Sequence, residues 1–345
     1  MATILILGAG VMGSALTVPA VDNGHRVTLA ATPHDGEVLA ALQASRASHP
    51  RLGAPLSPEI HVRDAGELTP ADAAAADLVI VGVSSPGIEW AADTVARLAP
   101  ACTIGLVTKG LVDARGPVPL TYATAFPDML RQRGVDARAF VGIGGPCIAR
   151  ELAERRPTAV VYASPDMGAA AAMKAMLETP YYRVSLSDDP VGVEACAALK
   201  NFFAIGVSAM LSRHTREGEP VKNPVAAAFQ QAVDEMAALV PWLGGQARSA
   251  YGLAGVGDLH VTVGGGRNSR LGRLLGEGMT IEAAMNGPLA GETVEGVDVG
   301  RVLDGHVRRA LRTGEFDGAD LALATALIDA IETNGILGFD IASGG

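Results

Sequence analysis

The feature that most constrains the fold is a short apolar run followed at once by three spaced glycines. Residues 4–7 are all aliphatic, and Gly8-Ala9-Gly10-Val11-Met12-Gly13 comes directly after them. This G-x-G-x-x-G spacing between a buried strand and a helix over 11–23 is the context of a dinucleotide-binding turn. Its glycines allow the tight bend, the approach of a pyrophosphate and close helix–strand packing. The alternative is a tight turn that binds no ligand.

Strand and helix patterns alternate through the first half of the chain. Short apolar runs predict strands over 4–7, 26–31, 77–83, 103–108, 139–143, 158–163 and 181–185. Helical patterns cover 11–23, 88–98 and 166–178. Such alternation predicts a Rossmann-like, doubly wound parallel sheet.

The pattern changes after residue 188. Helices are expected over 191–210, 224–242, 269–275, 294–313 and 318–334, with at most a short strand near His260. A chain of 345 residues is long for a single core. We therefore expect an α/β dinucleotide-binding domain over 1–188 and an all-α substrate-binding and catalytic domain over 189–345.

Charge and cysteine usage limit the classes of function. The net charge of −10 argues against a nucleic-acid binder, which needs a basic face. The three cysteines are widely spaced and form neither a disulfide framework nor a metal motif, which fits a reducing cytoplasm. No apolar run approaches the ~18 residues of a membrane span, so none is expected.

Lysine is rare in this chain, with only four in total, and Lys200 stands in an apolar, alanine-rich helical stretch beside Asn201. A buried ammonium is costly unless it is paired, and such a lysine suits proton exchange with a carbonyl or alcohol. The alternative is that Lys200 extends to solvent at the helix edge.

The segment over 252–270 is rich in glycine and carries Asp258, Thr262, Arg267 and Asn268. An arginine beside an asparagine can bind a cluster of anionic oxygens. The alternative is a flexible loop with solvated charges. At the end of the second strand, where an acid favours NAD and a base favours NADP, no residue is diagnostic, so the cofactor is written NAD(P)H.

Taken together, the chain resembles the bacterial type of the NAD(P)-dependent glycerol-3-phosphate dehydrogenase family. The shared motifs span nearly the whole chain and stand in family order: residues 8–15, 107–111, 145–151, 199–201, 252–268 and 293–296. The resemblance implies interconversion of dihydroxyacetone phosphate and sn-glycerol 3-phosphate, with no metal, by a cytoplasmic homodimer.

The resemblance also implies roles for single residues. Lys200 would be the general acid/base and Asp258 an active-site acid. The implied substrate-binding residues are Lys109, Asn201, Thr262, Arg267, Asn268 and Gly145. The implied cofactor-binding residues are Gly8, Gly10, Val11, Met12, Gly13, Lys109, Ala149, Arg267 and Glu295.

The chain departs from the family pattern mainly around the expected cofactor, notably at Met12, Cys147 and Ile148, and also at Gly266. Two alternatives stay open. One is another two-domain reductase, of the ketopantoate reductase or β-hydroxyacid dehydrogenase type. The other is a non-catalytic NAD(P)-binding sensor, which would need neither Lys200 nor Asp258.

Overall fold

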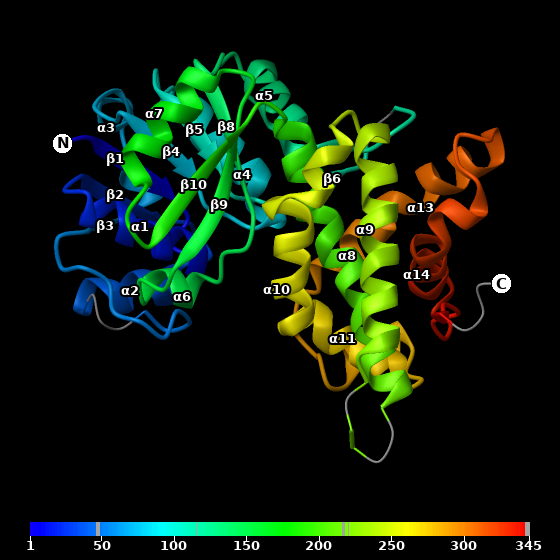
Figure 1. Cartoon of the computed structure of the whole chain (residues 1–345). Coiled ribbons are helices and arrows are strands. Elements are labelled where there is room, and N and C mark those ends of the chain that lie inside the picture. The colour runs from blue at the N-terminus through cyan, green and yellow to red at the C-terminus, as the bar shows by residue number, and fades with distance from the viewer. Residues whose placement is uncertain (46–48, 115, 216–217, 220, 342–345) are drawn as a thin grey trace. The chain divides into compact units, whose positions relative to one another are not determined.

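The computed structural model describes residues 1–345 except 46–48, 115, 216–217, 220 and 342–345. The chain divides into two compact units (Figure 1). The α/β unit consists of Met1–Lys109 and Tyr122–Val193, and the helical unit consists of Gly110–Thr121 and Glu194–Gly345.

The α/β unit is built on one eight-stranded sheet with the order β10-β9-β8-β5-β4-β1-β2-β3. The strands are β1 (Thr3–Leu7), β2 (Arg26–Ala31), β3 (His61–Asp64), β4 (Leu78–Val81), β5 (Thr103–Leu106), β8 (Ala139–Gly144), β9 (Thr158–Ala163) and β10 (Tyr182–Ser187). The strand order reverses at β1, which pairs in parallel with both β2 and β4. The doubly wound α/β class is confirmed. The expectation of a wholly parallel sheet is wrong at one edge, because β9 pairs antiparallel with β8.

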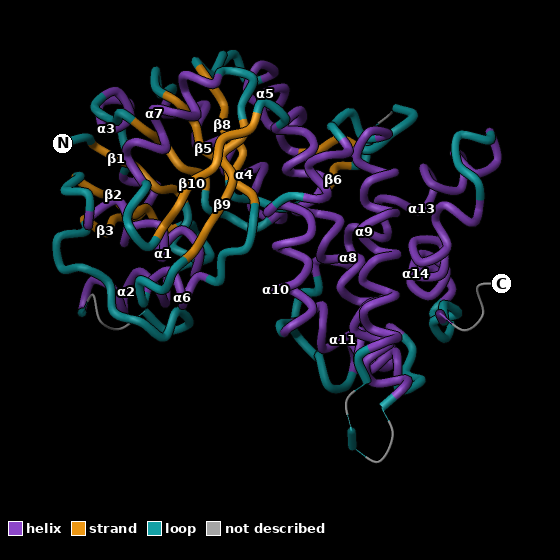
Figure 2. The backbone as a smooth tube through the Cα atoms, in the orientation of Figure 1, coloured by secondary structure: helices purple, strands orange, loops and turns teal. Residues whose placement is uncertain are grey.

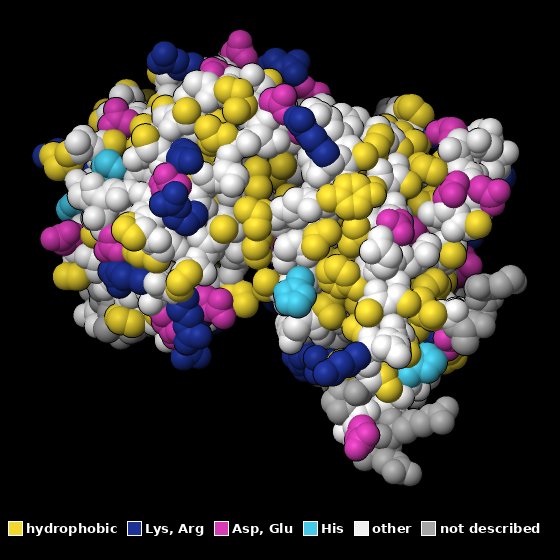
Figure 3. Space-filling view, viewed as in Figure 1, with side chains coloured by type: hydrophobic (Ala, Val, Ile, Leu, Met, Phe, Trp, Pro, Cys, Tyr) yellow, Lys and Arg dark blue, Asp and Glu magenta, His cyan; other side chains and the backbone are white. Residues whose placement is uncertain are grey.

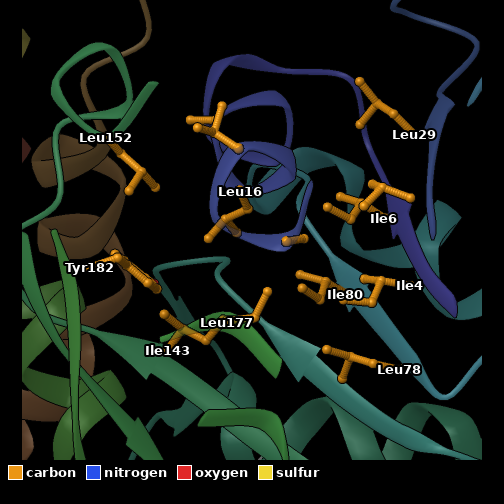
Figure 4. Packing of buried hydrophobic residues seen from close by; sticks show 14 of the residues in the cluster. Ile4, Ile6, Leu16, Leu29, Leu78, Ile80, Ile143, Leu152, Leu177 and Tyr182 are labelled. Carbon is orange, nitrogen blue, oxygen red and sulfur yellow. The ribbon is translucent and has the colours of Figure 1, made fainter. Parts of the chain in front are cut away.

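Helices accompany the strands along the chain (Figure 2). They are α1 (Val11–Asp22), α2 (Gly36–Ala44), α3 (Pro70–Ala74), α4 (Ile88–Leu98), α5 (Tyr122–Gln132), α6 (Ala149–Ala153) and α7 (Met167–Leu177). Helix α1 contacts α6 and α7, whereas α4 contacts α3 and α5, as expected for two helical layers around a doubly wound sheet. The core between α1 and the sheet is aliphatic, with Ile6, Leu16 and Ile80 almost fully buried (Figure 4).

The helical unit contains α8 (Pro190–His214) from Glu194 onward, together with α9 (Asn223–Trp242), α10 (Asp258–Gly264), α11 (Arg267–Gly276), α12 (Ile281–Asn286), α13 (Glu295–Thr313) and α14 (Ala322–Thr333). His260 lies within α10, so the expectation of a strand there is wrong. The unit also includes a small antiparallel hairpin of β6 (Leu111–Val112) and β7 (Leu120–Thr121). The guanidinium of Arg309 on α13 donates to the Pro117 carbonyl at 2.9 Å and so anchors this hairpin.

Glycines allow two helices to approach α8 closely. A Cβ on Gly272 or Gly276 of α11 would lie 2.1 or 2.2 Å from carbonyl oxygens of α8. A Cβ on Gly296 of α13 would lie 2.5 Å from the carbonyl oxygen of Asn201. These contacts leave no room for a larger side chain. They fix α11 against Ile205 and Ala209 of α8, and α13 against Asn201 of the same helix.

Helix α8 is long and apolar enough to cross a membrane by length and composition, which corrects the expectation that no stretch of the chain is. However, 89% of its apolar window is buried within the protein. The property is that of a core helix, and by itself it is weak evidence for a membrane span.

Candidate functional site

Lys200 forms a buried ion pair in the helical unit, and two acceptor oxygens orient its ammonium group. Its Nζ lies 3.0 Å from Oδ1 of Asp258 and 2.8 Å from Oγ1 of Thr262. Lys200 is 7% exposed and Asp258 only 2%. The alternative in which Lys200 extends to solvent is therefore wrong. The carboxylate stabilises the ammonium form in a place where an unpaired charge would be costly.

Thr262 is oriented by its own helix. Its hydroxyl donates to the carbonyl oxygen of Asp258 at 2.7 Å, one turn earlier in α10. The hydroxyl proton is thus committed to the backbone, and the oxygen can accept from the ammonium of Lys200. Asp258 and Thr262 therefore hold the lysine from the same face of one short helix.

A π-helical turn over Leu253–Gly257 leads into Asp258. Its wider winding is marked by the Gly257 N–H, which donates to the carbonyl oxygen of Gly252 at 3.2 Å. The turn requires glycine at 255, because a Cβ there would lie 1.9 Å from the carbonyl oxygen of Ala250. Such single π-turns are rare and occur frequently at functional sites. The glycine-rich segment is thus ordered helical backbone around Asp258 and Thr262, not the flexible loop of the alternative interpretation.

Asn201 and Asn268 join three helices beside the lysine. The Asn268 side-chain amide donates to Oδ1 of Asn201 at 3.1 Å. Its own oxygen accepts from the Gly296 backbone N–H at 2.9 Å. Both asparagines are buried. This network links α8, α11 and the start of α13, and it places amide groups next to Lys200 along α8.

Arg267 and Glu295 form an ion pair between the first residues of α11 and α13. Gly266, with φ of +95°, provides the left-handed turn just before Arg267. The Arg267 side chain is 46% exposed, so this guanidinium remains accessible to solvent and to an anion. The structure therefore brings the expected phosphate-binding arginine and the expected cofactor-contacting acid into direct contact.

The glycine turn of the α/β unit fits a pyrophosphate. Gly8 has φ of +111°, and a Cβ on Gly13 would lie 2.1 Å from the Gly8 carbonyl oxygen. By contrast, among the described residues no atom other than those of the chain neighbours lies within 4 Å of the Cβ position of Gly10. The first and third glycines are thus required by the protein's own packing, whereas the second leaves open space at the N-terminus of α1, where backbone N–H groups favour an anion. Val11 is exposed beside this space.

A pocket in the α/β unit opens beside the glycine turn. It is lined by Met12, Leu16, Val107, Lys109, Ile143, Gly144, Gly145, Cys147, Val160 and Tyr182. The carbonyl of Lys109 accepts from the Ser85 hydroxyl at 2.8 Å, and Gly145 adopts a φ of +105°. Three residues expected at the site, Met12, Lys109 and Gly145, therefore share one pocket. Ala149 is not among the lining residues and is the first residue of α6.

Two functional candidates were missed by the sequence reasoning. Asp35 and His49 are buried and contact the backbone of the glycine turn. No motif marks them, because their partner is a peptide group rather than a side chain. Over the residues that the structure describes, no group of three or more His, Cys, Asp or Glu side chains is arranged to hold a metal ion.

A glycine turn at the head of a doubly wound sheet and a buried lysine–carboxylate pair in a helical unit define a class, the two-domain nicotinamide-dependent dehydrogenases. Two family models narrow this class. The N-terminal model of NAD-dependent glycerol-3-phosphate dehydrogenase matches residues 3–170, and the C-terminal model matches residues 189–330. The chain belongs to the NAD-dependent glycerol-3-phosphate dehydrogenase family.

Individual relatives agree with this assignment. The NADP(+)-dependent glycerol-3-phosphate dehydrogenase of Archaeoglobus fulgidus is 38% identical, over 95% of this chain and 93% of that protein. The crystal structure of the Coxiella burnetii glycerol-3-phosphate dehydrogenase has a TM-score of 0.75 at 24% identity, over 96% and 98% of the two chains. A ketopantoate reductase from Ralstonia eutropha, one of the alternatives, has a lower TM-score of 0.54 at 18% identity, over 96% and 99%. The last two comparisons show a shared fold alone.

Proposed function

We propose that the protein interconverts dihydroxyacetone phosphate and sn-glycerol 3-phosphate by hydride transfer with NAD(P)H. The observation that carries the proposal is the buried contact of Lys200 with Asp258 and Thr262. It provides a charged, directed proton donor within a member of a dehydrogenase family.

Lys200 acts on the oxygen at C2 of the substrate. In the reducing direction the C2–O π bond breaks, a C–H bond forms at C2, and the oxygen gains negative charge. The ammonium of Lys200 stabilises this charge and transfers a proton from Nζ to the oxygen. The nicotinamide, when bound, supplies the hydride. In the reverse direction the neutral amine accepts the hydroxyl proton.

Asp258 and Thr262 restore Lys200 to a protonated, correctly oriented proton donor after each turnover. Once Lys200 has given up its proton, the adjacent carboxylate favours reprotonation by stabilising the ammonium. The Thr262 oxygen fixes the direction of one N–H bond. Both groups are held on α10, so the donor needs little reorganisation during the reaction.

The substrate phosphate is assigned to Arg267, and the residues assigned to the substrate as a whole are Lys109, Asn201, Thr262, Arg267, Asn268 and Gly145. Arg267 is accessible but paired with Glu295, so a phosphate dianion would share or replace that carboxylate on the guanidinium. Binding energy from the phosphate then orients the reacting carbon.

The cofactor is assigned to the glycine turn, with its pyrophosphate in the open space at Gly10. The residues assigned to it are Gly8, Gly10, Val11, Met12, Gly13, Lys109, Ala149, Arg267 and Glu295.

We further propose domains over 1–188 and 189–345, a cytoplasmic location and a homodimer. The dimer is tested by light scattering, where a mass near that of one 345-residue chain would refute it.

NADPH is the proposed preferred cofactor. The carboxylate of Asp35, just beyond β2, is buried and directed at backbone N–H groups, so it does not read a ribose hydroxyl. Arg51 lies nearby, with a guanidinium nitrogen 3.8 Å from Oδ1 of Asp35 and a side chain that is 63% exposed. An exposed arginine at this position favours a 2′-phosphate. The Archaeoglobus relative is named as NADP(+)-dependent.

The proposal is tested by following the oxidation of NADPH and NADH by the purified protein with dihydroxyacetone phosphate, ketopantoate or a β-keto acid. Of the three substrates, only dihydroxyacetone phosphate is expected to be turned over. The rate with NADPH is expected to exceed the rate with NADH. Turnover only with ketopantoate or the β-keto acid would move the protein to another reductase type. Cofactor binding without any turnover would favour a sensor.

On the face drawn in Figure 3, the described Lys and Arg side chains stand in small groups, several of them beside Asp or Glu. This distribution and the net charge of −10 fit a small anionic substrate held by a few placed cations, and we propose no nucleic-acid partner.

A further inference from the structure

One peptide segment of the glycine turn is held on both sides by buried side chains outside the glycine motif. The backbone N–H of Ala9 donates to Oδ2 of Asp35 at 3.2 Å, and Nε2 of His49 lies 3.1 Å from the carbonyl oxygen of Ala9. Asp35 is 8% exposed and His49 5%. We propose that Asp35 and His49 are positioning residues that preset the glycine turn for the cofactor.

Asp35 joins the turn to the neighbouring strand. The same oxygen, Oδ2, also accepts from the backbone N–H of Thr32 at 3.0 Å, directly after β2. One carboxylate oxygen therefore fixes the Ala9 N–H, which follows β1, relative to the end of β2. Because both donors are backbone groups, only the acceptor oxygen at this position is needed for the contact.

His49 is held in one tautomer. Its Nδ1 accepts from the backbone N–H groups of Arg51 and Leu52 at 3.2 and 3.1 Å. A neutral ring with an accepting Nδ1 carries its proton on Nε2, which then donates to the Ala9 carbonyl. Burial lowers the pKa of His49, which keeps the ring in this neutral form.

The Ala9 carbonyl also accepts from the buried Ser14 hydroxyl at 3.2 Å, and together with Asp35 and His49 this contact fixes the direction of the N–H group that follows Ala9. The Ala9 carbonyl and the Gly10 N–H belong to one planar peptide and point in opposite directions. Holding the carbonyl toward His49 therefore directs the Gly10 N–H away from it, while Asp35 fixes the preceding peptide. A turn preset in this way binds its ligand without the cost of ordering. The inference rests on the proposed function only in taking this turn as the cofactor site.

The histidine is tested with two amide variants that each keep one half of its bonding. In His49→Gln the terminal amide can replace the Nε2 donor, whereas in His49→Asn the side-chain oxygen can replace only the Nδ1 acceptor. NADPH affinity is measured by calorimetry, with no substrate present. We expect about a tenfold weaker Kd for H49N and a Kd within about threefold of wild type for H49Q. Equal affinity of the two variants would overturn the proposal.

The carboxylate is tested with Asp35→Asn and Asp35→Ala. The side-chain amide oxygen introduced by D35N can occupy the position of Oδ2 and accept both backbone donors, so D35N should retain affinity, whereas D35A should lose about tenfold. If D35A or H49N fails to fold, hydrogen exchange at residues 8–13 is compared between folded H49Q, D35N and wild type. We call the contacts of Asp35 and His49 with Ala9 the clamp. Similar protection in the variants and the wild type supports the clamp, and loss of protection in both variants contradicts it.

Activity separates this inference from the proposed function. With saturating NADPH, the folded variants should keep the kcat of the wild type for dihydroxyacetone phosphate, because the clamp does not contact the reacting atoms. Absence of turnover in the wild type would refute the proposed substrate, yet the pattern of NADPH affinities would still test the clamp.

Discussion

The Nζ atom of Lys200 on α8 lies 3.0 Å from the Oδ1 atom of Asp258 at the start of α10, and both side chains are almost fully buried. A buried pair of this kind contributes little net stability, and it is costly to leave one partner alone. The pair also lies near a π-turn and two asparagines, and the role proposed for it is proton transfer.

Replacing Asp258 by Asn should lower kcat by at least about 100-fold, because the ammonium of Lys200 loses its stabilising charge. The KM for NADPH should change little, because Asp258 lies in the helical unit and is assigned no cofactor contact. Steady-state kinetics with both substrates varied gives both values. Asp234→Asn on α9, where the carboxylate is exposed, is the matched control. A kcat of D258N within tenfold of the wild type would contradict the assigned role.

Two glycines of α13 should respond oppositely to alanine. Gly296→Ala introduces a Cβ that would lie 2.5 Å from the Asn201 carbonyl, so it should destabilise the protein by about 1–3 kcal/mol and disturb the network around Asn268. Gly305→Ala places its Cβ in open space among the residues that the structure describes, so it should stabilise the helix by about 0.5–1 kcal/mol. Urea unfolding measures both. Equal effects would show that α13 does not require the close contact with α8.

Glu235 should make stability depend on pH. It is fully buried on α9, and its carboxylate accepts from the backbone N–H groups of Leu323 and Ala324 at 2.6 and 2.7 Å. Burial raises its pKa to about 7. The native state therefore binds more protons than the unfolded state between the ordinary carboxyl pKa and pH 7. The associated stability is present at low pH and is lost as the pH rises through about 7.

The size of this effect is about 3 kcal/mol, from a pKa difference between 4.5 and about 7. Free energies of unfolding of wild type and Glu235→Gln, measured from pH 5 to 8, isolate it. The difference between the two proteins should shift against the wild type as pH rises. A difference that is constant with pH would contradict the raised pKa.

Arg51 should determine the choice between the two nicotinamide cofactors. Arg51→Ser removes the exposed guanidinium beside Asp35 and should reduce kcat/KM for NADPH by about 10- to 100-fold, with little change for NADH. Arg270→Ser removes a comparably exposed arginine in the helical unit and serves as the control. An unchanged ratio of the two kcat/KM values in R51S would refute the proposed NADPH preference.

The sequence was sufficient for the parts of the molecule that local patterns encode. The glycine turn, the central strands and the lysine within an apolar helix each follow from spacing and composition. The reversed β9 edge could not be predicted, because a short apolar run does not encode strand direction. The pairing of β6 with β7 was missed because these two-residue strands are held by contacts with α13, such as Arg309 with Pro117.

The site shows the same division. Residue type was enough to single out five residues of the site, and the structure brings them together on three helices of one unit. They are Lys200, Asp258, Thr262, Arg267 and Asn268. The π-turn before Asp258 depends on local backbone geometry, and the contacts of Asp35 and His49 depend on a backbone partner, Ala9, that is distant in sequence. Such backbone partners cannot be predicted from residue type alone.

The proton-transfer role of Lys200 is tested most sharply by the rate of NADPH oxidation by Lys200→Ala in the presence of saturating dihydroxyacetone phosphate, with NADPH binding measured on the same sample. We expect a kcat at least about 100-fold below the wild type, with the Kd for NADPH unchanged. A kcat within tenfold of the wild type in a folded variant that still binds NADPH would contradict this role.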